Sequence, residues 1–303
     1  MLAPVIVFSY NRPDHLSQTL EALAKNDLAQ ESVLYIYCDG AKPDATEEQL
    51  QRVLENRKVA HAAIGFKEVH VVERERNVGL KDNIIGAVTE IVNQYGRVIT
   101  LEDDVVSSVG FLKYMNEALE LYADEESVMH ISGYMYPHKS RLPETFFYPV
   151  PYPGGGWATW QRAWSQYNDN AQELYVYWKN KLDKFDVFGG DCLSYQLYEN
   201  YRGTKQTWFV KWYAVMRKQD ALTLYPGKSL TNNIGFDDLA TNCLAITDFD
   251  VIPTDYVKVV KIPLVINRKG SRLIFDFYQG HWYNKRRRKV LIKKIMDFVL
   301  FWK

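Results

Sequence analysis

Residues 97–104 read RVITLEDD, a mostly apolar run that ends in three consecutive carboxylates. A short, mostly apolar run of this kind is typical of a strand buried inside a parallel sheet. Adjacent carboxylates repel one another, so folding becomes costly unless a cation or hydrogen-bond donors neutralise them. The stretch therefore predicts a buried strand whose end holds a site for positive charge.

Strand and helix patterns alternate around this stretch through the first 135 residues. Apolar residues at helical spacing separate the predicted strands, for example over residues 80–95, and we expect Asp14 and Asp44 to cap two of the helices. The alternation predicts an α/β fold with a mostly parallel, Rossmann-like sheet flanked by helices. The predicted strands are residues 5–10, 33–38, 68–72, 97–101 and 128–131.

Polar residues follow four of these strands directly. Each such segment taken alone is an ordinary turn or cap. Because parallel sheets bind ligands at the carboxyl ends of their strands, the four segments together favour a functional site at one edge. They are Ser9-Tyr10-Asn11-Arg12, Asp39-Gly40, Arg76-Asn77-Val78-Gly79 and Glu102-Asp103-Asp104.

Composition changes near residue 137, where prolines and the run Gly154-Gly155-Gly156 break any long element. We therefore expect an α/β lobe over residues 1–135 and a loop-rich lobe with short helices over residues 136–280. Residues 225–235 have the composition of a long functional loop.

The formal net charge of zero is the sum of two opposed parts. Residues 281–303 hold eight Lys or Arg and one Asp, a net charge of +7, so the rest of the chain carries −7. The run Lys285-Arg286-Arg287-Arg288-Lys289 precedes an apolar stretch, residues 295–302, that is too short to span a bilayer. This pattern predicts a basic amphipathic tail that associates with an anionic membrane surface. An RNA-binding tail and a helix docked on the body are the alternatives.

Cysteine usage and the N-terminal sequence favour a cytoplasmic location, and the basic tail would place the protein peripherally on the inner face of the membrane. Cys38, Cys192 and Cys243 are widely spaced and form neither a zinc pattern nor a disulfide framework, which favours a reducing compartment. The N-terminus lacks the pattern of a signal peptide, and no run of eighteen apolar residues occurs. The balanced overall charge gives no reason to expect a nucleic-acid partner.

The acidic triplet also predicts a cofactor. Hard carboxylate oxygens select Mn²⁺ or Mg²⁺, which bind one or two protein carboxylates together with substrate phosphates. We therefore expect a nucleoside diphosphate that the metal bridges to the protein. No Gly-x-Gly-x-x-Gly follows the first strand and no phosphate-loop motif occurs, which argues against dinucleotide and P-loop sites.

With its four segments in this order, the chain resembles the metal-dependent nucleotide-sugar glycosyltransferases of the GT-A fold. Glu102-Asp103-Asp104 is similar to the metal motif of the N-acetylglucosaminyltransferase I family, and Gly155-Gly156-Trp157 resembles the Gly-x-Gly-Trp segment that follows there. The resemblance covers the first 135 residues well and the second lobe in patches. It implies a donor-binding lobe over 1–135, an acceptor-binding lobe over 136–280 and inversion at the anomeric carbon.

The resemblance also implies roles for individual residues. Asp104 would bind the metal, Asp39 the nucleotide base, and Arg12 the ribose or phosphate. Glu102 and Asp103 would hold hydroxyls or metal-bound water. The other expected donor-binding residues are Ser9, Asn11, Asn77, Lys81, Asn83, Lys228 and Ser229, and the expected acceptor-binding residues are Gly156 and Trp157.

Three of these assignments have an ordinary alternative. Lys228 and Ser229 either close over the diphosphate or form a plain surface loop. Trp157, like Trp160, stacks either on a sugar or within an aromatic core.

An inverting transfer needs a general base, and Asp191 is the candidate. The family has two adjacent acidic residues there, whereas Gly190 precedes Asp191 in this chain. A helix N-cap is the structural alternative for Asp191, and Asp237 and Asp238 are competing candidates for the base.

The sequence thus favours a glycosyltransferase of the hexosyltransferase type that moves a sugar to a saccharide acceptor. A lipid-linked glycan in polysaccharide biosynthesis would explain the basic tail. A sugar-1-phosphate nucleotidyltransferase is the enzymatic alternative, but it would carry a Gly-rich loop where Asn11-Arg12-Pro13 stands. A non-catalytic, membrane-attached sugar-binding protein is the other alternative, and the intact acidic triplet argues against it.

Overall fold

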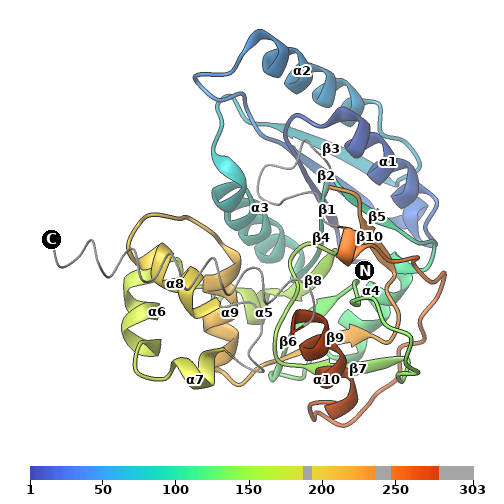
Figure 1. Ribbon diagram of the computed structural model, residues 1–303. Helices are drawn as coiled ribbons and strands as arrows, with labels where there is room; N and C mark the ends of the chain where they lie inside the picture. The colour runs from blue at the N-terminus through green and yellow to red at the C-terminus, as the bar shows by residue number, and fades with distance from the viewer. Residues whose placement is uncertain (187–192, 236–246, 280–303) are drawn as a thin grey trace, which may run out of the picture.

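The computed structural model describes residues 1–186, 193–235 and 247–279 (Figure 1). Its centre is an eight-stranded sheet with the strand order β3-β2-β1-β4-β8-β6-β9-β7. All strands run in one direction except β8 and β7, so the predicted α/β fold with a mostly parallel sheet is confirmed. The strands are β1 (Val5–Ser9), β2 (Val33–Cys38), β3 (Glu68–Glu73), β4 (Arg97–Glu102), β6 (Val128–Ser132), β7 (Thr145–Tyr148), β8 (Trp157–Trp160) and β9 (Leu222–Pro226).

Helices cover both faces of the sheet (Figure 1). Val5 and Val7 of β1 face the layer of α1, α2 and α4, while Ile6 and Phe8 face the layer of α3, α5 and α9. β1 is buried along its whole length, which explains its unbroken apolar sequence. The helices are α1 (Pro13–Ala24), α2 (Glu47–His61), α3 (Gly79–Tyr95), α4 (Phe111–Leu121), α5 (Gln161–Trp164), α6 (Ala171–Trp178), α7 (Leu182–Phe185), α8 (Leu193–Tyr201), α9 (Phe209–Lys218) and α10 (Arg268–Phe277), with short 3₁₀ turns η1 (Ala29–Glu31) and η3 (Thr247–Phe249).

The sheet crosses the predicted boundary at residue 135. β8 lies between β4 and β6, where Ala158 pairs with both Ile99 and Ile131. β9 and β7 complete that side of the sheet. Residues 1–135 and 136–280 therefore share one sheet, while α6 to α9 lie together beside it (Figure 1).

Two helix starts differ from the expected ones. Pro13 begins α1 after the N-cap residue Arg12, and Asp14 lies in the first turn rather than at the cap. Proline suits that position because its nitrogen has no hydrogen to satisfy and its φ is already helical. Thr46 caps α2 in a reciprocal capping box with Gln49. The capping roles predicted for Asp14 and Asp44 were therefore wrong.

A small antiparallel ribbon lies over the end of the sheet. It joins β5 (Val105–Ser107), directly after the acidic triplet, to β10 (Thr231–Asn233). Residues 225–235 were expected to form one long loop, but they contain the end of β9 and the whole of β10. The ribbon thereby brings residues 231–235 against the end of β4.

Among the described residues no helix is both long and apolar enough to cross a bilayer. The predicted basic tail, residues 281–303, lies outside the described residues.

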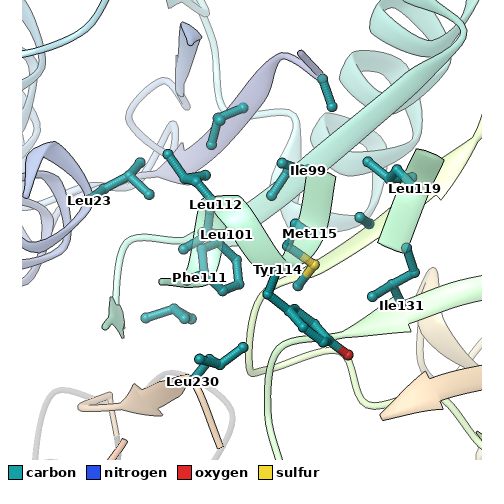
Figure 2. Close-up of a cluster of buried hydrophobic side chains, with 14 of the residues drawn as sticks. Leu23, Ile99, Leu101, Phe111, Leu112, Tyr114, Met115, Leu119, Ile131 and Leu230 are labelled. Atoms are coloured by element: carbon teal, nitrogen blue, oxygen red, sulfur yellow. The ribbon is translucent and has the colours of Figure 1, made fainter. Parts of the chain in front are cut away.

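The α4 side of the sheet holds one compact apolar cluster (Figure 2). Phe111, Leu112 and Met115 of α4 are fully buried beside Leu101 and Ile131. The Phe111 ring also leaves little room for a side chain at Gly156, in the glycine run 154–156. A Cβ on Gly156, whose φ is +71°, would lie 3.0 Å from Cζ of that ring. The cluster thus joins α4 to the strand that carries the acidic triplet.

We expect Phe111→Ala to lower the free energy of unfolding by roughly 3–5 kcal/mol, because the lost ring leaves a cavity in this cluster. Urea unfolding monitored by circular dichroism measures the change. The matched control is Ile64→Ala, which truncates a side chain that is 82% exposed and is expected to change stability by less than about 0.5 kcal/mol. Equal losses in the two variants would contradict this account of the core.

Candidate functional site

Arg12 bridges the two aspartates at the end of β4. β1 and β4 pair in parallel with Phe8 opposite Glu102, so their carboxyl ends meet. Nη2 of Arg12 contacts Oδ1 of Asp103 and lies 2.8 Å from Oδ2 of Asp104. The side chains are 16%, 5% and 11% exposed, respectively. Arg12, a side chain of the protein itself, therefore supplies the positive charge that the acidic triplet was predicted to need.

Asn233 reaches the same pair of carboxylates from β10. Its Nδ2 donates to Oδ1 of Asp104 (3.2 Å) and to the carbonyl oxygen of Gly154 (2.9 Å). Its Oδ1 accepts from the backbone N–H of Gly235 (2.8 Å). A Cβ on Gly235 would lie 2.0 Å from Oδ2 of Asp104, so only glycine fits. Sequence reasoning missed Asn233, and the only available signal was the polar run Asn232-Asn233-Ile234-Gly235.

Burial changes the protonation of Glu102 and Asp103. Burial, with Asp104 and then Asp103 adding to it, raises the pKa of Glu102 to about 8. Burial also raises the pKa of Asp103 to about 7, although the Arg12 charge opposes the rise. These two carboxyl groups therefore hold protons to an unusually high pH, and additional positive charge would favour their ionised forms.

The carboxylate oxygens at this edge fit a hard divalent cation that takes most of its ligands from phosphates and water. Within the described ranges, no three His, Cys, Asp or Glu side chains gather as a metal site. Asp103 and Asp104 nevertheless offer carboxylate oxygens, each able to accept more than one contact. Mg²⁺ and Mn²⁺ need only one or two such groups when phosphates and water complete the shell. The Arg12 guanidinium lies against these same oxygens and is their cationic partner in this structure.

Asp39 holds together two loops at the neighbouring strand ends. Its Oδ1 accepts from the backbone N–H groups of Gly40 and Val78, both at 2.9 Å, and its Oδ2 accepts from that of Gly79 at 2.9 Å. Asn77 Nδ2 donates to the carbonyl oxygen of Gly40 at 2.8 Å. Both residues were predicted to bind the donor. The structure brings them to the predicted edge, where they fix the start of α3, and their contact with a nucleotide stays a prediction.

Lys81 lies at the start of α3 in a network that sequence reasoning did not find. Its Nζ is 3.0 Å from Oδ2 of Asp169, and Nζ of the buried Lys211 is 2.6 Å from Oδ1 of the same residue. Although burial opposes it, hydrogen bonds from Lys211 and Lys81 lower the pKa of Asp169. No sequence pattern marks Lys211, which lies among the apolar residues of α9. The network holds Lys81 beside the predicted donor edge.

Several of the other predicted site residues form hydrogen bonds or ring contacts with neighbouring residues of the protein. The Ser9 hydroxyl donates to Cys38 Sγ and accepts from Asn56, Asn83 Oδ1 accepts from Arg74 Nε, and the Ser229 hydroxyl donates to the Thr231 carbonyl oxygen. Trp157 is buried and stacks on His130 and Trp208, as the core alternative described. Gly156 lies next to it in the loop before β8, Asn11 is half-buried, and Lys228 is exposed.

The candidate general bases cannot be placed. Asp191, Asp237 and Asp238 all lie outside the described residues.

Comparison with known proteins agrees with this geometry. The model of the family described as "Glycosyl transferase family 2" matches residues 5–167, which is more than half of the chain and includes the ends of β1, β2, β3 and β4. The same range contains Arg12, Asp39 and Asp104.

Solved structures give weaker similarities. A crystal structure of S. aureus TarS is 20% identical over 48% of this chain and 23% of its own, with a TM-score of 0.30. The TarS 1–349 structure is 18% identical over 48% of this chain and 41% of its own, with a TM-score of 0.31. Apo mouse xyloside xylosyltransferase 1 is 10% identical over 73% of this chain and 82% of its own, with a TM-score of 0.36. The chain thus spans less than half the length of the TarS chains, and TM-scores this low support no conclusion about it.

We expect Arg12→Met to destabilise the chain in a pH-dependent way. In buffer with a metal chelator, the loss should be roughly 3–5 kcal/mol at about pH 8.5, because two buried carboxylates lose their cation. The loss should shrink at about pH 6. There Asp103 binds a proton in the folded chain, although a carboxyl of ordinary pKa in the unfolded chain does not, so Asp103 no longer needs the charge of Arg12. Urea unfolding at the two pH values measures this, with Arg12→Lys as the charge-retaining control. An equal loss at both pH values would contradict the assigned role.

Proposed function

Because the chain belongs to glycosyl transferase family 2, we propose that it transfers a sugar from a nucleoside-diphosphate donor to a saccharide acceptor. The observation that carries the proposal is the meeting of Arg12, Asp103 and Asp104 at the carboxyl ends of β1 and β4. Ligands of parallel α/β sheets bind at this edge. We propose that the reaction is of the hexosyltransferase type and that the donor binds here.

Arg12 is the proposed contact for the diphosphate. Both of its carboxylate contacts use Nη2. A guanidinium has five N–H donors, and among the described residues none accepts from Nη1 or Nε of Arg12. The remaining donors suit phosphate oxygens, which guanidinium binds in a two-pronged arrangement. Arg12 can therefore hold the carboxylates and the donor at the same time.

We propose that the reaction depends on Mn²⁺ or Mg²⁺, with Asp104 as the direct ligand and Asp103 and Glu102 beside it. When bound, such a cation stabilises the negative charge that develops on the diphosphate as it leaves. The residues of the chain orient the donor around this point. Asn233 fixes the Asp104 carboxylate, and Asp39 holds the loop before α3 in place.

Inversion at the anomeric carbon remains part of the proposal, and it rests on the resemblance to the N-acetylglucosaminyltransferase I family. It requires a base on the face opposite the leaving diphosphate. Asp191 is the proposed base, with Asp237 and Asp238 as the alternatives to test.

We also propose that the acceptor is a lipid-linked saccharide and that the protein is peripheral on the inner face of a membrane. The +7 charge of residues 281–303 supports this, because each Lys or Arg near an anionic surface contributes about 1 kcal/mol.

A panel of nucleotide sugars, screened for release of the nucleoside diphosphate with and without Mn²⁺, tests the proposed chemistry. We expect metal-dependent release with at least one donor and acceptor mixture. Asp104→Ala should lower kcat/KM by roughly 100-fold or more, because it removes an electrostatic contact made at the reacting centre.

Asp124→Ala is the matched control, since it removes an exposed aspartate distant in sequence from the four strand ends. Metal-independent release, or an Asp104→Ala variant with the activity of the parent chain, would reject the metal assignment. Absence of both donor binding and turnover across the panel would reject the transferase proposal.

The tail has its own test. Replacing Lys285, Arg286, Arg287, Arg288 and Lys289 with Gln in the full chain should weaken sedimentation with anionic vesicles by at least about tenfold, because five favourable charges are lost. Release of the nucleoside diphosphate from the donor, measured with a soluble acceptor, should be unchanged. Unchanged sedimentation would contradict the role of the tail.

A further inference from the structure

An extended segment, residues 251–266, crosses the surface between η3 and α10. We call it the strap (Figure 1, orange to red). It is fixed to the body at both ends and in the middle. The Gly110 N–H donates to the carbonyl oxygen of Asp255 (3.0 Å), and the Ile262 N–H donates to the Tyr122 hydroxyl (3.2 Å). Ile266 then bridges Phe147 of the edge strand β7, so the strap is a built part of the fold.

The end of the strap exposes a run of aliphatic side chains. Leu264 is 38% exposed, Val265 66% and Ile266 42%, whereas Val257 earlier in the strap is buried. Single exposed apolar residues are common on protein surfaces and need no explanation. Three consecutive ones on a segment that is fixed in place indicate a surface that something apolar covers.

Cations stand on both sides of this run. Lys258 and Lys261 precede it, and Arg268, Lys269 and Arg272 follow it, against a single acid, Asp276, over residues 256–279. Lys261 pairs with Glu125 and Arg272 with Asp276.

The other three cations, Lys258, Arg268 and Lys269, form no ion pair with any residue that the structure describes. Lys269 Nζ donates to the carbonyl oxygen of Arg141 at 2.8 Å, which brings the exposed Arg141 beside it. We call the three exposed aliphatic residues with Lys258, Arg268, Lys269 and Arg141 the strap patch.

We propose that the strap patch binds the surface of an anionic lipid bilayer. Aliphatic side chains between cations that form no ion pair with the described residues match such a surface, since the cations meet the headgroups while the aliphatic groups enter the boundary of the acyl chains. A nucleic acid would satisfy the cations but leave Leu264 and Val265 in water, because its affinity comes from phosphate contacts. A second copy of the chain would bring like charges together in a symmetric contact.

The basic tail does not suit this patch either. Residues 281–303 carry +7, so the tail and the patch repel one another and are both attracted to anionic lipid. The proposal depends only on described residues and not on the donor chemistry. Its failure would therefore leave the proposed transferase activity untouched.

Sedimentation of the full chain with phosphatidylcholine vesicles, with and without about 30% phosphatidylglycerol, tests the proposal. We expect Leu264→Gln/Val265→Gln and Arg268→Gln/Lys269→Gln each to weaken binding to the anionic vesicles by about tenfold. The charge variant should also reduce the dependence of binding on salt, because it removes part of the electrostatic attraction. Diphosphate release measured without vesicles should equal that of the parent chain.

Matched controls separate this surface from general effects. Ile64→Gln removes an aliphatic side chain that is 82% exposed on another part of the fold, and it should leave vesicle binding unchanged. The proposal is overturned if both patch variants bind the vesicles as the parent chain does. It is also overturned if Ile64→Gln loses as much binding as the patch variants. A parent chain that binds double-stranded RNA through Arg268 and Lys269 but binds neither kind of vesicle overturns it as well.

Discussion

The contact of Arg12 with Asp103 and Asp104 is the interaction on which the end of the sheet depends. Two adjacent carboxylates at the end of a buried strand repel one another, and their desolvation adds to the cost. Arg12 reaches them because α1 starts at Pro13, shortly after β1 ends at Ser9, which leaves the N-cap side chain beside the end of β4. The Thr19 hydroxyl of α1 donates to the Asp103 carbonyl oxygen at 2.8 Å and holds the helix against the same point. Charge, helix start and strand pairing thus depend on one another.

Backbone proximity is the second constraint on this site. The chain returns over the carboxylates through the β5–β10 ribbon, more than a hundred residues after the triplet. Asn233 can then donate both to Asp104 and to the Gly154 carbonyl oxygen, and the absence of a side chain at Gly235 lets the backbone lie directly on Asp104. A charged site held this closely depends on the ribbon as much as on the strands that supply its carboxylates.

Local sequence determined more of this fold than of this site. Buried parallel strands have continuous apolar runs, so residues 33–38 and the edge defined by Asp39 and the acidic triplet could be predicted. Capping was harder, because several polar residues near Thr46 compete for one position. β8 could not be placed, since its insertion between β4 and β6 is a pairing of distant segments. Lys211 was missed for the same reason, because its partner Asp169 lies far away in sequence, in the loop before α6.

Folding and the proposed reaction make opposite demands on the carboxylates of Asp103 and Asp104. Folding favours their neutralisation, either by protons, which explains the raised pKa of Asp103, or by Arg12. Binding a diphosphate through a cation requires them ionised and accessible. A guanidinium can meet both demands, because it neutralises the pair through one nitrogen and keeps its other N–H groups for an anion. A lysine would supply the charge as a single point without that second set of directed donors. The chemistry of arginine therefore suits Arg12 both to its observed role as counter-ion of Asp103 and Asp104 and to its proposed role as a ligand of the donor.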